Sequence, residues 1–164
     1  MLKRVLCALV LALLLVVAGC STPKSDFFDL FRGGYVAEVA GTLYGIDISA
    51  KIEMGAVGEA VCAPATITFY APEEILGTVI TRTEDGTITL FCGDVAAGDM
   101  GGVGAALFAL FPTSGSVSKT EVTEQGRTRV ALEGAELEFL SDGTPYSVKT
   151  GDLSLTVVQW QAHG

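Results

Sequence analysis

Apolar and polar side chains alternate with a period of two along most of the chain after residue 34, which is typical of β-strands that bury one face. Residues 46–54 show this most clearly, because every second side chain is apolar and the others are polar or charged. If Tyr44-Gly45 forms a two-residue turn, residues 35–43 pair with this strand and Glu38 lies beside Lys51. The apolar pairs are then Tyr35–Met54, Ala37–Ile52, Val39–Ala50 and Leu43–Ile46. The pattern therefore predicts an antiparallel hairpin with one apolar face.

The same reasoning predicts hairpins along the rest of the chain. A two-residue turn at Asp85-Gly86 gives the pairs Thr83–Ile88, Thr81–Leu90 and Val79–Cys92. A three-residue loop ending in Gly126, which supplies a left-handed position, gives Val122–Thr128 and Glu121–Arg129. A turn at Glu133-Gly134 gives Val130–Leu137, Thr128–Phe139 and Arg129–Glu138. A loop at 141–144 gives Phe139–Tyr146 and Leu137–Val148, and Gly151-Asp152 gives Val148–Leu155 and Tyr146–Val157. Finally, a four-residue loop at 55–58 pairs Ile52 with Val61 and Ala50 with Ala63.

Three stretches depart from the strand pattern. Ser25 is a candidate N-cap for a short helix that ends at Gly33-Gly34 and carries Phe27, Leu30 and Phe31 on one side. Residues 72–76 have the composition of a single helical turn after a proline, closed by a glycine. Residues 102–111 are the one longer helix candidate, apolar on every side and stopped by Pro112, so this helix must either be buried or lie against another apolar surface.

The fold class predicted from these elements is mainly β with minor α. We expect a curved antiparallel meander, or incomplete barrel, of about ten strands, with the apolar helix inserted between the fifth and sixth strands. A single sheet of this size should curl, and the helix 102–111 is expected to fill its concave side.

The N-terminus carries the strongest single signal. Lys3 and Arg4 precede an apolar run, and the small residues at 17–19 lead into Cys20, which is the layout of a secretory signal with a cysteine at its end. The apolar run is too short for a comfortable transmembrane helix. The pattern resembles a bacterial lipobox, which implies cleavage before Cys20 and a lipid on its thiol. We therefore expect a lipoprotein signal peptide at 1–19, a lipidated tether with a short helix at 20–33, and a half-barrel domain at 34–164. An ordinary signal peptide with a nearby cysteine is the alternative.

Charge narrows the possible partners. Removing Lys3 and Arg4 leaves 10 − 2 = 8 basic residues against 19 acidic ones, a balance of −11. A chain this acidic should not favour nucleic acid. The expected partners are the membrane, through Cys20 on its extracytoplasmic face, and a lipid or other apolar small molecule.

The order of elements resembles the lipoprotein-sorting half-barrels of the LolA/LolB/LppX-like superfamily over residues 34–160. The resemblance rests on the two opening strands around Tyr44-Gly45, Ile67-Thr68-Phe69 leading to residues 72–77, the turn at Asp85-Gly86, the apolar helix, Asp142-Gly143-Thr144-Pro145, and a closing strand that ends in Trp160. It implies a curved open barrel whose concave face can hold acyl chains.

Many of the positions expected on the concave face are small. They either leave room for a ligand or are filled by the helix 102–111, and the sequence leaves both possibilities open. The candidate lining residues are Ala37, Val39, Ala50, Ile52, Ala63, Ala65, Ile67, Leu90, Leu107, Phe111, Val130, Leu137 and Val148, with Thr81 and Thr128 as polar inward neighbours.

The cysteines, the histidine and the glycine-rich segment give little evidence of a catalytic, metal or cofactor site. Cys62 is expected to point outward and Cys92 inward and buried, so that they form two free thiols. Without CxxC spacing, neither suggests a metal or redox site. The glycines at 102 and 104 imitate a dinucleotide fingerprint, but the flanking strands are not a βαβ unit. His163, the sole histidine, lies next to the C-terminus and is a poor general base. We therefore expect no catalytic residues, no metal and no cofactor.

Two functions remain from the sequence. The first is a membrane-anchored, non-enzymatic lipoprotein that binds lipid or another apolar ligand on the concave face. The alternative is a surface interaction or assembly lipoprotein whose core is fully packed.

Overall fold

The computed structural model describes residues 27–59, 62–98, 107–113 and 115–163. The protein is mainly β, with one antiparallel sheet of eleven strands that does not close into a barrel. The strands are β1 (Tyr35–Leu43), β2 (Ile46–Met54), β3 (Ala65–Ala71), β4 (Val79–Arg82), β5 (Ile88–Cys92), β6 (Val95–Gly98), β7 (Val117–Val122), β8 (Thr128–Leu132), β9 (Ala135–Phe139), β10 (Pro145–Thr150) and β11 (Leu153–Ala162). Two helical elements lie wholly within the described residues: α2 (Asp29–Arg32) and the 3₁₀-helix η1 (Glu73–Ile75), which is the single turn predicted after Pro72.

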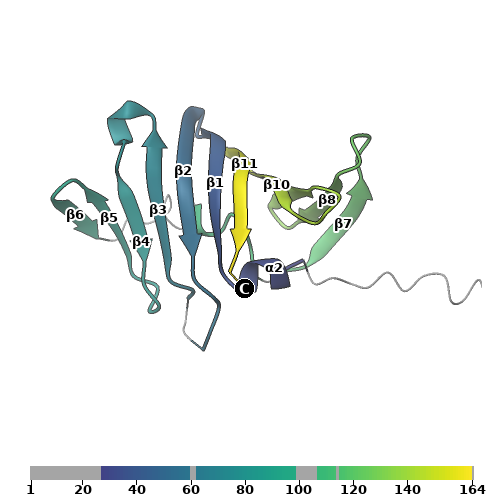
Figure 1. The fold of residues 1–164 in the computed structure, drawn as a ribbon, viewed down its shortest axis with the longest axis horizontal. Coiled ribbons are helices and arrows are strands. Elements are labelled where there is room, and N and C mark those ends of the chain that lie inside the picture. The colour runs from purple at the N-terminus through teal and green to yellow at the C-terminus, as the bar shows by residue number, and fades with distance from the viewer. Residues whose placement is uncertain (1–26, 60–61, 99–106, 114, 164) are drawn as a thin grey trace, which may run out of the picture.

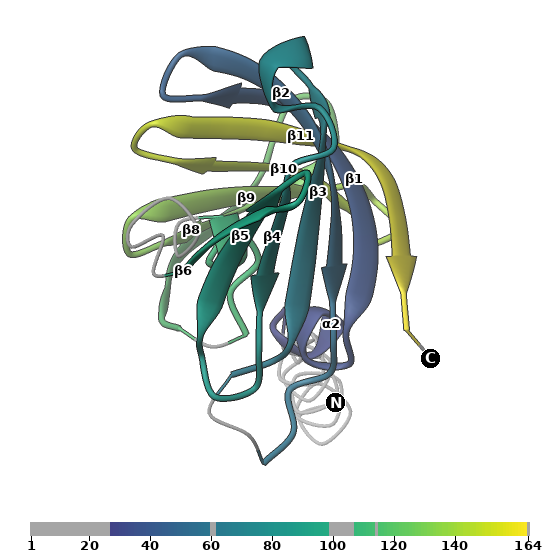
Figure 2. The ribbon, with the colours of Figure 1, turned by 90° about the vertical axis from the view of Figure 1, so that its left-hand side faces the viewer.

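The strand order is β6-β5-β4-β3-β2-β1-β11-β10-β9-β8-β7 (Figure 1). Two meanders therefore meet where β1 pairs with β11, a long-range contact that turn analysis does not reveal. In Figure 2 both ends of the sheet lie on the same side of the central strands, so the sheet is bent and has a concave face. The expected mainly β fold is confirmed. The eleventh strand is β6, a short edge strand beyond Cys92 that the sequence pattern did not show.

Several predicted registers are confirmed. Strands β1 and β2 pair as expected, with Ala37 opposite Ile52 and Glu38 opposite Lys51. The pairings around the turns at 126 and 133–134 also match, and they place Glu121 and Glu138 on either side of Arg129. Leu137–Val148 and Val148–Leu155 are further correct pairs.

Two predicted registers are wrong for one shared reason. In β4 and β5, Arg82 pairs with Ile88 and Ile80 with Leu90, one residue away from the expected pairs. In β9 and β10, Phe139 pairs with Pro145, and a bulge follows at Tyr146. Both connections are three-residue loops that end in a left-handed glycine, at Gly86 (φ 88°) and Gly143 (φ 86°), like the loop at Gly126 (φ 75°). In each loop the N–H of the residue before the loop donates to the carbonyl of the residue after it, from Thr83 to Thr87, Thr123 to Arg127 and Leu140 to Thr144. The N–H of the loop glycine then donates back to the carbonyl of the residue before the loop.

The register of β2 against β3 is also wrong. Ile52 pairs with Ile67 rather than Val61, and Ala50 pairs with Phe69 rather than Ala63. The connection between the two strands is longer than expected, and backbone hydrogen bonds hold it in place. The N–H of Gly55 donates to the carbonyl of Pro64 at 2.8 Å, and the N–H of Val57 donates to the carbonyl of Arg32 at 2.8 Å.

Two segments fill the concave side. The first is α2 with its flanks. It begins at Asp29, and the expected cap Ser25 lies outside the described residues. The second is the C-terminal part of the expected helix 102–111, of which residues 102–106 lie outside the described residues. Leu107 and Phe108 are helical, and the side chains of Leu107, Phe108, Leu110 and Phe111 are buried in the core. The expectation that this segment is buried against the sheet is confirmed for its described part.

An aromatic cluster joins these segments to the sheet. Phe31 of α2 stacks on Phe111 at 5.3 Å between ring centroids and meets Trp160 of β11 edge-on at 5.7 Å. Tyr35 stacks on Trp160 at 4.5 Å, and Phe27 packs on Phe139 at 5.4 Å. Residues 27–31 thus form part of the core of the domain.

Candidate functional site

The predicted lining residues are mainly core residues. Twelve of the thirteen have buried side chains, and Leu90 is partly buried against them. The buried ones are Ala37, Val39, Ala50, Ile52, Ala63, Ala65, Ile67, Leu107, Phe111, Val130, Leu137 and Val148. Small side chains in the middle of the sheet therefore face the aromatic rings and the segment 107–111 rather than the solvent.

Space for a ligand lies instead at the borders between the sheet and the two segments that fill its concave side, α2 with its flanks and residues 107–113. The first border cleft, which we call the Arg82 cleft, has a volume of about 310 Å³. It is lined by Met54, Val57, Cys62, Ala63, Arg82, Phe108, Ala109, Phe111, Pro112 and Thr113. The second, the Phe139 cleft, has a volume of about 490 Å³ and is lined by Phe27, Leu30, Thr128, Phe139, Leu140, Ser141, Asp142 and Gly143. Of the candidates named from sequence, Ala63 and Phe111 line the first cleft and Thr128 the second.

Arg82 brings a positive charge to the concave face. Paired residues of neighbouring strands point to the same side of a sheet. Tyr35, Met54, Ala65 and Arg82 form one such row, since each is paired with the next. Tyr35, Met54 and Ala65 are buried on the concave face, so the Arg82 side chain also points to the concave face. Thr81, which the sequence placed inward, lies on the opposite face because of the three-residue loop.

The Arg82 guanidinium is held by neutral groups. Its Nε donates to the carbonyl of Ala63 at 3.0 Å, and an Nη contacts Met54 Sδ at 3.3 Å. Its central carbon lies 4.8 Å from the centre of the Phe108 ring, a cation–π contact. Burial raises the pKa of the Tyr35 phenol, and the positive charge of Arg82 opposes that rise. Tyr35 therefore stays protonated at neutral pH and contributes no negative charge to the cleft.

Arg82 differs from the other described arginines in its partners. Arg32 pairs with Asp29 at 2.9 Å, Arg129 with Glu138 at 2.7 Å, and Arg127 with Glu138 at 3.5 Å. Within the described residues, no carboxylate lies within ion-pair distance of Arg82. The Arg82 guanidinium is therefore a positive charge without a described acidic partner, beside the apolar lining of the cleft.

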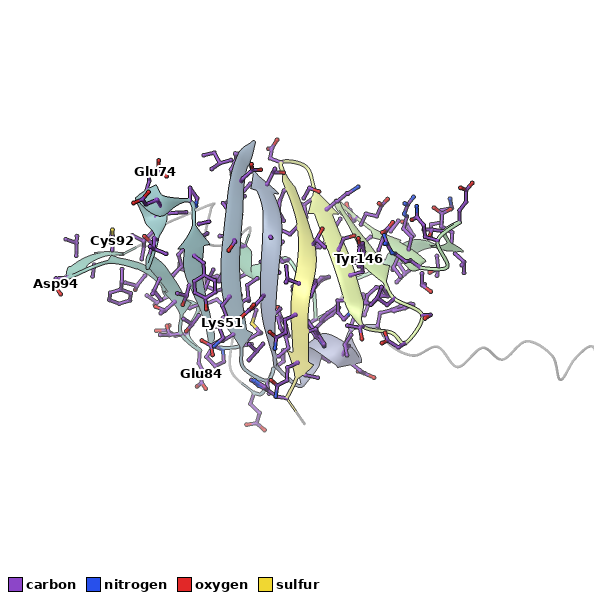
Figure 3. The ribbon with its side chains drawn as sticks, turned by 45° about the horizontal axis from the view of Figure 1, so that its top comes forward. Lys51, Glu74, Glu84, Cys92, Asp94 and Tyr146 are labelled. Carbon is purple, nitrogen blue, oxygen red and sulfur yellow. The ribbon has the colours of Figure 1, made fainter. Side chains whose placement is uncertain are left out.

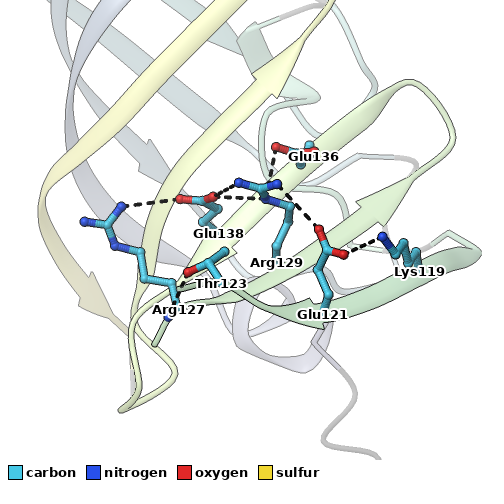
Figure 4. A network of polar contacts seen from close by, with 7 residues as sticks. All are labelled: Lys119, Glu121, Thr123, Arg127, Arg129, Glu136 and Glu138. Carbon is cyan, nitrogen blue, oxygen red and sulfur yellow. Dashed lines mark hydrogen bonds and ion pairs between the residues drawn. The ribbon is translucent and has the colours of Figure 1, made fainter. Parts of the chain in front are cut away.

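The outer face of β7, β8 and β9 carries the opposite arrangement, a closed network of paired charges (Figure 4). Arg129 contacts Glu121, Glu136 and Glu138, and Lys119 pairs with Glu121. Hydrogen bonds from Arg129 hold the pKa of Glu138 below its ordinary value, against a smaller effect of burial. The network is partly exposed, from Lys119 at its outer end to the more buried Glu138, so each pair contributes modestly to stability. Every charge in this network has a partner. This face is a solvated surface rather than a ligand site.

Cys62 and Cys92, the two cysteines among the described residues, are both free, as expected. Cys62 is half-buried and lines the Arg82 cleft. The prediction that Cys92 is buried is wrong, because it lies exposed at the end of β5, near the edge of the sheet (Figure 3). The expected register placed Cys92 opposite Val79, whereas Val79 pairs with Phe91 and Cys92 lies beyond the last pair of β4 and β5.

The histidine, the acidic residues and the fingerprint-like glycines considered in the sequence analysis add no described catalytic or metal-binding group to the two clefts. Within the described ranges, no group of three or more His, Cys, Asp or Glu side chains could hold a metal ion. The backbone N–H of His163 donates to the carbonyl of Gly34 at 2.9 Å. The glycines of the fingerprint-like segment, at 102 and 104, lie outside the described residues. No helix in the described part of the chain is both long and apolar enough to cross a membrane.

Sequence reasoning missed Arg82 although the signal was present. The loops Glu84-Asp85-Gly86 and Glu124-Gln125-Gly126 have the same length, and both end in glycine. Treating the first like the second moves Arg82 from the outer face to the concave one.

Comparison with known proteins adds information on the fold alone. No family model matches the chain. No curated protein matches it either. Among solved structures, the chain is similar to an uncharacterized conserved protein from Thermus thermophilus, with a TM-score of 0.52, 13% sequence identity and a match covering 84% of each chain. At this identity the likeness establishes a shared architecture and carries no information on activity.

Proposed function

We propose that this protein is a non-enzymatic lipoprotein, anchored through Cys20 to the extracytoplasmic face of a membrane, that binds an apolar ligand on the concave side of its sheet. The observation that carries the proposal is the Arg82 cleft, which has an apolar lining and about 310 Å³ of space. That volume lies at the lower end of the range for small-molecule sites. The lipobox-like sequence at 17–20 and the likeness of the element order to the LolA/LolB/LppX half-barrels support the same interpretation.

The anchor and the cleft fit together functionally. One acyl chain holds a protein weakly at a membrane, whereas two or more hold it stably, so a diacylated or triacylated Cys20 would keep the domain beside its lipid source. The aromatic cluster fixes the first described residues after the tether to the domain, through Phe27 and Phe31. The sheet is then held a short tether away from the bilayer.

Photo-crosslinking tests the proposal on the full-length protein in phosphatidylcholine nanodiscs. The probe is dodecanamide with a diazirine in its chain, and the labelled peptides are mapped by mass spectrometry. We expect labelling of peptides that contain Met54 and Phe108. Ala109→Trp, at an exposed lining position, should reduce this labelling several-fold, whereas the control Ala96→Trp, at an exposed position of β6, should leave it unchanged. Absence of cleft labelling in the unmodified protein would refute the proposal.

A second function is favoured by a different observation. Val95, Val117 and Val122 belong to the edge strands, and their side chains are 68%, 41% and 73% exposed. Their pairing with Cys92, Leu132 and Thr128 places them on the concave side. With a packed centre and exposed apolar rims, this side also fits a protein partner. A photoreactive amino acid at residues 95 and 122 would then capture the same partner in intact cells, and one at Val158 would not.

A further inference from the structure

We propose that the Arg82 cleft selects an amphiphile with a single apolar chain and an anionic head, a carboxylate or a phosphate, and that Arg82 binds this head. The inference rests on the proposed apolar-ligand function and adds the chemical class of the ligand.

The first argument is the unmatched charge. The chain has 19 acidic residues against 10 basic ones, so carboxylates are abundant. Even so, the three other described arginines each have an acidic partner and Arg82 has none among the described residues. A charged group in apolar surroundings costs free energy unless it is paired and hydrogen-bonded. A ligand anion would supply the partner that Arg82 lacks among the described residues.

The second argument is the geometry of the donors. The contacts to Ala63 and Met54 use Nε and one Nη atom of Arg82, and the other Nη contacts no described acceptor. The guanidinium carries five N–H donors in a planar fork that fits carboxylate and phosphate oxygens. The two existing contacts and the Phe108 ring fix the orientation of the fork, so little side-chain freedom remains to be lost on binding.

The third argument is the lining around the charge. Met54, Phe108 and Phe111 surround Arg82 with apolar surface, which suits the chain of the amphiphile. The limited volume favours one chain over two. An apolar lining with a single convergent charge is the pattern by which a site fixes the orientation of an apolar molecule.

The test compares four probes that share a dodecyl chain and diazirine and differ in the head: carboxylate, phosphate, neutral amide and trimethylammonium. Each is added to the full-length protein in phosphatidylcholine nanodiscs, and labelling of the Met54 and Phe108 peptides is measured. On the unmodified protein we expect one or both anionic probes to label these peptides several-fold more than the amide, and the cationic probe to label them less. The two anionic arms decide between a carboxylate and a phosphate head.

The variant arm is Arg82→Gln, with Lys149→Gln as the control that removes an exposed positive charge elsewhere. Arg82→Gln should remove the preference for the anionic probes over the amide probe, measured as the ratio of their labelling within that variant, and Lys149→Gln should leave this ratio unchanged. Equal labelling by anionic and amide probes, or an anionic preference that survives in Arg82→Gln, overturns the inference while leaving the proposed function in place. Cleft labelling by none of the four probes overturns both. The head-group comparison needs only the unmodified protein, so it decides the question even if the variant is unstable.

Discussion

Replacing Phe31 by alanine tests whether α2 and its flanking residues are part of the folded core. The Phe31 side chain is 1% exposed and is surrounded by aromatic rings. The centroids of Tyr35, Phe111, Phe139 and Trp160 lie 6.1, 5.3, 6.3 and 5.7 Å from its own. The substitution therefore leaves a cavity where α2, the segment 107–111 and the sheet meet.

The expected cost follows from this environment. A buried Phe→Ala change usually costs about 3–5 kcal/mol, from lost transfer free energy and the cavity left behind. Aromatic pairs add about 0.5–1.5 kcal/mol beyond the buried area, and Phe31 makes several of them, so we expect the upper half of the range, about 4–5 kcal/mol. For a domain of this size that corresponds to a fall in Tm of roughly 15 °C.

Urea unfolding of residues 21–164, followed by tryptophan fluorescence, measures the effect, because Trp160 lies in the same cluster. The matched control is Phe91→Ala, whose ring is 40% exposed on the outer face and should cost about 1 kcal/mol. The midpoint should fall with little change in the slope m. If Phe31→Ala costs no more than Phe91→Ala, α2 does not belong to the core.

Four further outcomes are expected. Cys20→Ala should abolish metabolic labelling of the full chain with radioactive palmitate, and labelling that persists would contradict the lipobox. Gly86→Ala should cost about 1–2 kcal/mol in urea unfolding because φ is +88°, and a cost near zero would contradict the three-residue loop. Hydrogen bonds from Arg129 lower the pKa of Glu138 in the folded state. The Arg129–Glu138 pair therefore stabilises the fold above the ordinary carboxyl pKa, and this stabilisation is lost as the pH falls through the lowered pKa. The urea midpoint should therefore drop more steeply toward about pH 3 in the unmodified protein than in Glu138→Gln. A thiol reagent should modify Cys92 faster than Cys62, and equal rates would contradict their different exposure.

Local pairing could be predicted from the sequence wherever the turn was identified correctly. The hairpin around Tyr44-Gly45 follows from its two-residue turn together with alternation, because a one-residue slip would place Glu38 among the apolar side chains. The pairs Val79–Cys92 and Phe139–Tyr146 were wrong because loop length, not alternation, sets the register, and glycine at the third loop position was recognised in one of three equivalent loops.

The candidate site was harder to predict for a different reason. The sequence shows which side chains face inward, but it does not show which of them the rest of the chain covers. Ala37 and Val148 point inward as expected and are covered completely. The clefts lie at the borders of α2 and the segment 107–113, which depend on packing between elements far apart in the chain.

The pairing of β1 with β11 has a consequence for how the protein is made. Residues 35–43 hydrogen-bond to residues 153–162. One edge of β1 pairs with β2, and the other edge stays unpaired until β11, the last strand, has folded against it. Closing so long a loop is slow, and an unpaired edge invites strands from other molecules in the meantime. Because synthesis begins at the N-terminus, this edge of β1 stays uncovered until residues 153–162 have been made, and it is the edge where protection by a chaperone would matter most.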